Sequence, residues 1–217
     1  GLFLILLGLF KKAVISDYIS LNFVDRIFDA PTLYSGLENL MAVYGYALQI
    51  YCDFSGYSDM AIGIALFLGF RFNKNFNYPY ISKSVTEFWR RWHISLSTWL
   101  KDYLYIPLGG NRKGRIRTYI NLIITMLLGG LWHGAALRFI LWGGMHGIAL
   151  AIHKVWCALF YPEHKKRIKR NGIGKAIGGI ITFHFVCFAW IFFRADSIDV
   201  VEQVLTQITS NFHPEII

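Results

Sequence analysis

Apolar residues occupy most of the chain in long runs, which are separated by short polar or basic stretches. The runs cover residues 1–19, 37–70, 118–137, 139–160 and 176–193. About 20 residues of helix are needed to cross a bilayer. The pattern therefore predicts an all-α protein that is a polytopic transmembrane helical bundle, with the polar stretches at the membrane surfaces.

The run at residues 37–70 is longer than one simple span requires. Polar and small residues interrupt it at Asp53, Ser55, Gly56, Ser58 and Asp59. Non-helical backbone is tolerated at membrane depth only where protein or water satisfies it. We therefore expect two helical halves joined at a polar break, preceded by a polar connection at residues 22–35.

Residues 87–105, EFWRRWHISLSTWLKDYLY, follow two candidate helix caps, Ser84 and Thr86. Their apolar residues recur at helical spacing, and they are Phe88, Trp92, Leu96, Trp99 and Tyr103. The intervening charged side chains make a complete crossing costly. The pattern predicts a single amphipathic helix that lies in the interface or is re-entrant. The tail at residues 197–217 predicts a second, short amphipathic helix, with Val200, Val201, Val204, Leu205 and Ile208 on one face.

Composition supports membrane insertion. Of the 217 residues, 55% are hydrophobic and only 16% are charged, whereas about a quarter are charged in a typical soluble domain. The net charge of +9 arises between apolar runs, above all at residues 106–117 and 163–175, so we expect both ends of the 118–160 hairpin to be cytoplasmic. We expect contact with membrane lipids and no nucleic-acid binding. Three separate cysteines without a CxxC pair suggest neither a disulfide nor a metal site.

Histidines provide the candidate chemistry. His133 lies in LLGGLWHGA, roughly 22 Å along a helix that starts at Thr118, and an ionisable side chain at membrane depth is a functional candidate. Its flanking glycines permit close approach of a ligand or a backbone, and Trp132 offers a flat apolar wall. For His146, as for His153 and His184, helix packing or snorkelling is the simpler explanation.

Three separated motifs resemble the membrane-bound O-acyltransferases, and specifically the bacterial branch that modifies alginate and teichoic acids. They are the run from YCDFSGYSDM to YIPLGGNRKG, the segment LLGGLWHGA, and TFHFVCFAWIFFRAD. The resemblance implies a ring of tilted helices around a thin centre, with His133 as the catalytic residue and His93 in the same tunnel. Because members of this family are longer, residues 1–217 would form a single membrane domain lacking its N-terminal and C-terminal spans.

This family's reaction requires that a hydroxyl lose its proton as it attacks an acyl thioester. A neutral imidazole in an apolar wall suits the role of base, so His133 is expected to take that proton. His93 is expected to orient the acceptor or to stabilise the oxyanion, together with Asn121 or a tryptophan N–H. Candidate tunnel residues are Trp132, Trp92, Asn121, Arg90 and Arg91. The two arginines would bind an anionic donor, although phospholipid headgroups explain them equally well.

These inferences predict an acyltransferase of the bacterial inner membrane that transfers acetyl groups to an exported polysaccharide such as alginate. The donor would be a thioester co-substrate, acetyl-CoA or an acyl carrier, with no bound cofactor, and a periplasmic SGNH-type acetyltransferase would be a partner. Two alternatives remain open. One is D-alanyl transfer from a carrier protein to teichoic acid, and the other is a membrane transporter or channel.

Overall fold

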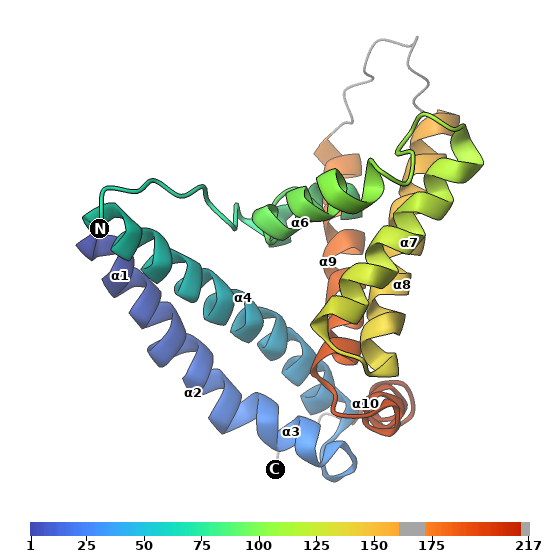
Figure 1. The fold of residues 1–217 in the computed structure, drawn as a ribbon. Coiled ribbons are helices and arrows are strands. Elements are labelled where there is room, and N and C mark those ends of the chain that lie inside the picture. The colour runs from blue at the N-terminus through green and yellow to red at the C-terminus, as the bar shows by residue number, and fades with distance from the viewer. Residues whose placement is uncertain (161–171, 214–217) are drawn as a thin grey trace. The chain divides into compact units, whose positions relative to one another are not determined.

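The computed structural model describes residues 1–160 and 172–213, and it contains helices and loops with no strand in those ranges. The prediction of an all-α chain is therefore confirmed. The chain divides into two compact units. The first contains residues 1–75 and the segment from Trp190 onward, and the second contains Phe76–Ala189. Figure 1 shows the helices of each.

The first unit is built on two long helical runs that lie side by side (Figure 1). One passes without interruption through α1, two π-helical turns, α2 and α3. Its parts are α1 (Leu2–Leu9), η1 (Phe10–Ser16), α2 (Asp17–Ile19), η2 (Ser20–Val24) and α3 (Asp25–Asp29). The prediction of a polar connection at residues 22–35 is thus wrong over its first half. Only the stretch after Asp29, which includes the short 3₁₀ helix η3 (Pro31–Leu33), connects to the next helix.

The other run, α4 (Gly36–Phe67), is one continuous helix, so the predicted break into two halves is wrong. Its start is a capping box, in which the Ser35 side chain accepts from the Glu38 backbone N–H and the Glu38 carboxylate accepts from the Ser35 N–H. Asp53, Gly56 and Asp59, near its middle, face the first run and do not interrupt the helix. Gly56 meets the backbone of Gly8, where any side chain would separate the two helices.

Ion pairs between the two runs account for the two carboxylates that suggested a break. Lys11 Nζ lies 2.6 Å from Asp59 Oδ2, and Lys12 Nζ lies 2.7 Å from Asp53 Oδ1. A charged side chain at membrane depth is stabilised by such a partner. Two carboxylates within one apolar helix therefore need not end it.

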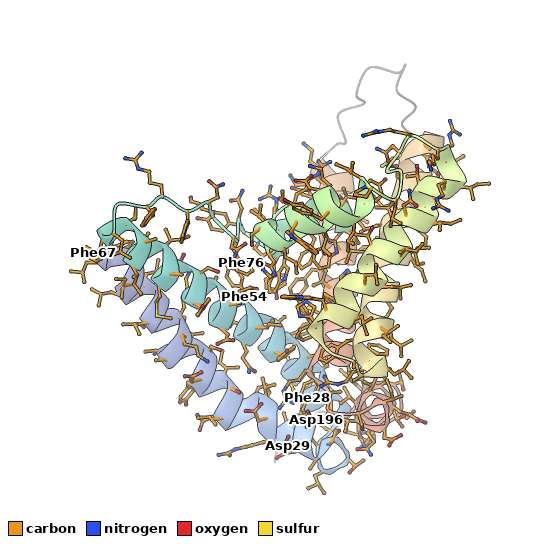
Figure 2. The ribbon with its side chains drawn as sticks, viewed as in Figure 1. Phe28, Asp29, Phe54, Phe67, Phe76 and Asp196 are labelled. Atoms are coloured by element: carbon orange, nitrogen blue, oxygen red, sulfur yellow. The ribbon has the colours of Figure 1, made fainter. Side chains whose placement is uncertain are left out.

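The C-terminal part of the first unit is the predicted amphipathic helix, α10 (Ile198–Ser210), which buries Val201 and Val204. Arg194, at the end of α9, donates to Asp25 Oδ1 at 2.6 Å, and it also lies 3.9 Å from both Asp29 and Asp196. Figure 2 labels these last two residues with Phe28, whose ring lies under the Arg194 guanidinium at 5.3 Å.

In the second unit, residues 85–105 do not form the single amphipathic helix that was predicted. The segment divides into α5 (Val85–Trp89), α6 (Ile94–Leu100) and the π-helical turn η5 (Lys101–Tyr105). Ser84 caps α5 by accepting from the Glu87 N–H, which confirms one of the two candidate caps. The short 3₁₀ helix η4 (Pro79–Ile81) precedes this segment.

The predicted hairpin is confirmed as α7 (Arg115–His133) and α8 (Leu137–Phe160), which run side by side (Figure 1). Glycines allow close approach of the two backbones. A Cβ on Gly143 would collide with the Met126 carbonyl, and one on Gly130 would collide with the Phe139 carbonyl. The paired glycines of the sequence therefore act here as packing sites.

The last long helix, α9 (Gly172–Arg194), covers the predicted span at residues 176–193. Among the described helices it is the one that is long and apolar enough to cross a membrane by length and composition, with a mean hydropathy of 2.0 over its most apolar window. The basic loop predicted at residues 163–175 lies mostly outside the described residues.

Candidate active site

His93 lies at the break between α5 and α6, where its backbone adopts a left-handed conformation with φ of 42°. Its neighbour Trp92 is held in the aromatic core of the unit. The Trp92 ring is only 4% exposed and packs against the rings of Phe76 at 5.0 Å and Phe88 at 5.6 Å. A left-handed residue is costly outside glycine and asparagine, and such outliers concentrate at functional sites.

His133 is the last residue of α7 and is half-buried. Its imidazole lies between aromatic rings from two helices. The ring centroids are 4.9 Å from Trp132, 5.3 Å from Trp142 and 6.5 Å from Phe139. Trp132 is 64% exposed, so one side of the histidine is walled by an accessible indole and the other by the packed side of α8.

The two histidines lie close enough together for the charge of one to act on the other. Burial, and after it the charge of His133, lowers the pKa of His93 from 6.5 to about 4. His93 is therefore neutral at physiological pH, and a neutral imidazole carries one N–H donor and one acceptor nitrogen. Two histidines that are 40 residues apart in the sequence are thus electrostatically linked within one unit.

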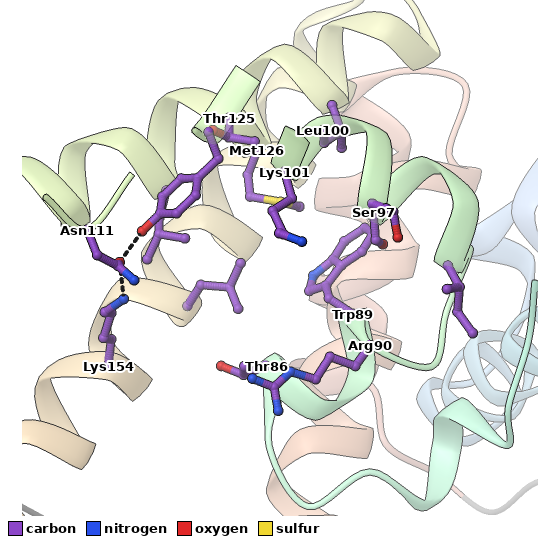
Figure 3. A pocket seen from close by; sticks show the side chains of 15 residues that line it. Thr86, Trp89, Arg90, Ser97, Leu100, Lys101, Asn111, Thr125, Met126 and Lys154 are labelled. Carbon is purple, nitrogen blue, oxygen red and sulfur yellow. Dashed lines mark hydrogen bonds between the residues drawn. The ribbon is translucent and has the colours of Figure 1, made fainter. Parts of the chain in front are cut away.

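A pocket of about 560 Å³ opens in the same unit, next to the break that holds His93 (Figure 3). Arg90 and Ile94, which flank the break, line it together with Trp89. Basic and neutral polar side chains complete its wall, and the described residues that line it include no carboxylate. These polar residues are Lys101, Lys154, Thr86, Ser97, Thr98, Tyr105, Asn111 and Thr125.

Hydrogen bonds hold one side of this pocket in place. The Asn111 side-chain oxygen accepts from Lys154 Nζ at 2.6 Å and from the Tyr105 hydroxyl, as the dashed lines in Figure 3 show. Lys101 Nζ lies 3.2 Å from the carboxylate of Asp102. With Arg90, these basic groups suit a phosphate or another anion.

Other predicted tunnel residues have different surroundings. Arg91 forms an ion pair with Glu87 at 2.8 Å and is not among the pocket residues. Asn121 is fully buried and donates to the Gly110 carbonyl, and it precedes His133 by 12 residues, about 18 Å along α7. The structure thus brings His93, His133 and Trp132 together, and it places Arg90 in the pocket. Trp92 lies in the aromatic core of the unit.

The sequence interpretation missed several residues that surround this site. Lys101, Lys154 and Asn111 meet only through folding. Trp142 and His146 are four residues apart, so the sequence places them on one helix face. This was a weak indication of a shared role, and helix packing was the interpretation given to His146. No group of three or more His, Cys, Asp or Glu side chains in the described part of the chain is placed to hold a metal ion.

Comparison with known proteins identifies the family. The family model for membrane-bound O-acyltransferases matches residues 1–194. A peptidoglycan O-acetyltransferase of Helicobacter pylori is 47% identical over 94% of this chain and 38% of its own length. A probable alginate O-acetylase of Pseudomonas aeruginosa is 49% identical over 89% of this chain and 35% of its own length.

A teichoic acid D-alanyltransferase of Bacillus subtilis is 32% identical over 89% of this chain and 50% of its own length. The chain thus spans half or less of the length of each of these relatives. The match to the family model nevertheless covers most of the 217 residues. The chain belongs to the membrane-bound O-acyltransferase family.

Proposed function

We propose that the full-length protein is a multi-pass O-acyltransferase of the bacterial inner membrane that transfers acetyl groups to hydroxyls of an exported polysaccharide. The observation that carries the proposal is that His93 and His133 act electrostatically on one another within one unit, and that the break holding His93 adjoins a cation-lined pocket. The relatives add support, because the two O-acetyltransferases compared are 47% and 49% identical to this chain. The two units would be parts of one membrane domain that further spans complete.

In this mechanism His133 is the general base. Its neutral imidazole takes the proton of the acceptor hydroxyl as the oxygen attacks the thioester carbonyl. The new C–O bond forms, the C–S bond breaks, and the proton passes to the leaving thiolate. General-base help contributes about 10² to 10⁴-fold, and the alignment of both substrates must supply much of the remainder.

His93 would act on the other reactant. With its pKa lowered to about 4, it stays neutral and offers one N–H that can donate to the oxyanion or to the acceptor. A donor that is fixed before the reaction stabilises developing charge without reorganisation. The structure supports Asn121 less well for this task, because its side chain is engaged with Gly110 far along α7.

The cation-lined pocket would hold the anionic part of the acyl donor. Acetyl-CoA and a phosphopantetheine arm both carry phosphate, for which Arg90 and Lys154 are suited. Such a donor is a co-substrate, and it would enter from the cytoplasmic side. A periplasmic SGNH-type acetyltransferase would then receive the acyl group or share the acceptor.

D-alanyl transfer to teichoic acid is the second candidate, because the Bacillus subtilis relative carries that name at 32% identity. One experiment tests both. Ester-linked acetate and ester-linked alanine are measured on the cell-surface polymers of cells that carry the full-length gene, unchanged or with His133→Ala, at matched membrane abundance.

Loss of acetate in the His133→Ala strain is the expected result, and selective loss of alanine would instead favour the second candidate. The control is His184→Ala. This histidine is exposed on α9 and forms a hydrogen bond of 2.8 Å with a carbonyl of its own helix, so its replacement should leave both esters unchanged. Undiminished esters in the His133→Ala strain would remove His133 from the mechanism.

A further inference from the structure

His146, in the middle of α8, is completely enclosed, with 0% of its surface exposed. Four aromatic side chains from three helices surround its imidazole. The ring centroids lie 5.0 Å from Trp142, 5.1 Å from Trp89, 5.2 Å from Phe185 and 6.3 Å from Phe88. A polar ring in such an enclosure is costly unless it is hydrogen-bonded. Simple packing would be served better by another apolar residue.

One hydrogen bond sets the state of this imidazole. Trp89 Nε1–H donates to His146 Nδ1 at 3.2 Å. Because an indole can only donate, Nδ1 must carry a lone pair, so the ring is neutral and its proton is on Nε2. Nε2 is buried and has no hydrogen-bond partner among the described residues. Within that part of the chain, the orientation of the imidazole depends on Trp89.

Trp142 connects this enclosure to the proposed base. Its ring is 2% exposed and meets Trp89 at 5.8 Å and His146 at 5.0 Å. It also meets the ring of His133 at 5.3 Å with an interplanar angle of 89°. The indole that walls one side of His133 is therefore held by the hydrogen-bonded pair Trp89 and His146.

We propose that His146 is a positioning residue for His133, which it orients through Trp142 by means of its hydrogen bond with Trp89. This inference rests on the proposed role of His133 as base. It assigns a task to a histidine that is hydrogen-bonded to the pocket residue Trp89 and that is connected to His133 through Trp142. Loss of the hydrogen bond would leave a buried indole N–H unpaired and would free the Trp142 wall to move.

Two replacements of His146 separate positioning from packing. Asparagine places its side-chain oxygen where Nδ1 of histidine lies, so it can still accept from Trp89. Leucine fills the aromatic enclosure with apolar atoms but cannot accept a hydrogen bond. Positioning predicts that His146→Asn is more active than His146→Leu, whereas packing alone predicts the reverse, because it is costly to bury an amide among aromatic rings.

The experiment measures ester-linked acetate and alanine on surface polymers in cells with the full-length protein at matched membrane abundance. His146→Leu should lower the ester content about tenfold, because a displacement of about 1 Å can cost up to about 100-fold in rate. His146→Asn should recover most of the loss. His184→Leu, the matched control on α9, should not differ from the unchanged protein.

Full activity of His146→Leu would overturn the proposal, as would equal losses in the Leu and Asn variants or a greater loss in the Asn variant. If the Leu variant does not accumulate, Trp89→Phe removes the same hydrogen bond from the donor side, and full activity there would also overturn it. Undiminished esters with His133→Ala are a separate outcome, because they would defeat the proposed function and leave His146 with nothing to position.

Discussion

In the first unit, α1 and α4 approach one another at Gly8 and Gly56, and in the second, α7 and α8 approach at Gly130 and Gly143. The two pairs of helices are thus packed by the same device. Small residues let backbones come close where helix association depends on packing. The difference lies in what each pair does with its polar side chains.

Between the long helices of the first unit, opposite charges face one another. Lys11 pairs with Asp59 and Lys12 pairs with Asp53, so the fold neutralises these charges internally. In the second unit, the pocket gathers Arg90, Lys101 and Lys154, and the described residues that line it include no carboxylate, although Lys101 pairs with Asp102 outside the lining. The first unit pairs these lysines with carboxylates of the fold, whereas we propose that an anionic ligand complements Arg90 and Lys154 in the pocket.

The largest loss of stability is expected at the close glycine contacts between paired helices, the feature that the two units share. Gly143→Ala should prevent stable accumulation, because a Cβ at Gly143 would collide with the backbone carbonyl of Met126, and backbone cannot move aside as a side chain can. Gly144→Ala is the matched control, since its Cβ would meet only the Leu127 side chain at 3.4 Å. Membrane abundance and thermal stability of the full-length protein in detergent measure both. Equal stability of the two variants would show that close approach of α7 and α8 is not required.

The ion pairs of the first unit should contribute to stability and not to turnover. Lys11→Met leaves Asp59, which is 21% exposed, without its partner, and the loss of one member of a partly buried pair costs about 1 to 3 kcal/mol. Thermal unfolding should show this loss. The double change Lys11→Met with Asp59→Leu should recover much of it, since an apolar pair can replace an ion pair. A double variant less stable than the single one would contradict this explanation.

The pocket cations should show the opposite behaviour. Arg90→Gln and Lys154→Gln should each raise the KM for acetyl-CoA about tenfold, because a hydrogen bond to a charged group contributes about 1.5 to 3 kcal/mol, while stability changes little. Lys12→Gln in the first unit is the matched loss of a cation, and its KM should not change. If Lys12→Gln raised the KM as much as the pocket substitutions do, the proposed difference between stabilising and ligand-binding cations would be wrong.

A further expected effect concerns pH. The pKa of His93 is lowered from 6.5 to about 4, so between these values the unfolded chain binds a proton that the folded protein does not. Stability should therefore fall as pH decreases from about 6.5 to about 4. His93→Gln should reduce this decrease, which thermal unfolding at pH 5 and pH 7 can measure. An identical decrease in the variant would show that His93 is not the group responsible.

Several features were predictable because they depend on local pattern. The hairpin of α7 and α8 follows from two uninterrupted apolar runs between basic stretches. The amphipathic helix α10 follows from valines and leucines at helical spacing. His133 was predicted as a candidate because an ionisable residue between glycines is unusual in an apolar run, and family resemblance assigned it a role.

Other features depend on contacts between distant segments. The continuity of α4 through Asp53 and Asp59 requires the lysines of the first helical run. The break at His93 is not apparent in a helical periodicity that continues through it, and it is seen only in the folded chain, where His93 adopts a left-handed backbone conformation.

Local hydrophobic pattern was thus sufficient to establish helices, membrane character and one candidate histidine, because each depends on the order of neighbouring residues. The pocket and the enclosure of His146 required the folded chain. Arg90 and Lys154 are 64 residues apart, and Trp89 and His146 are 57 residues apart. Pairing at such separations depends on how helices pack, which no local pattern encodes.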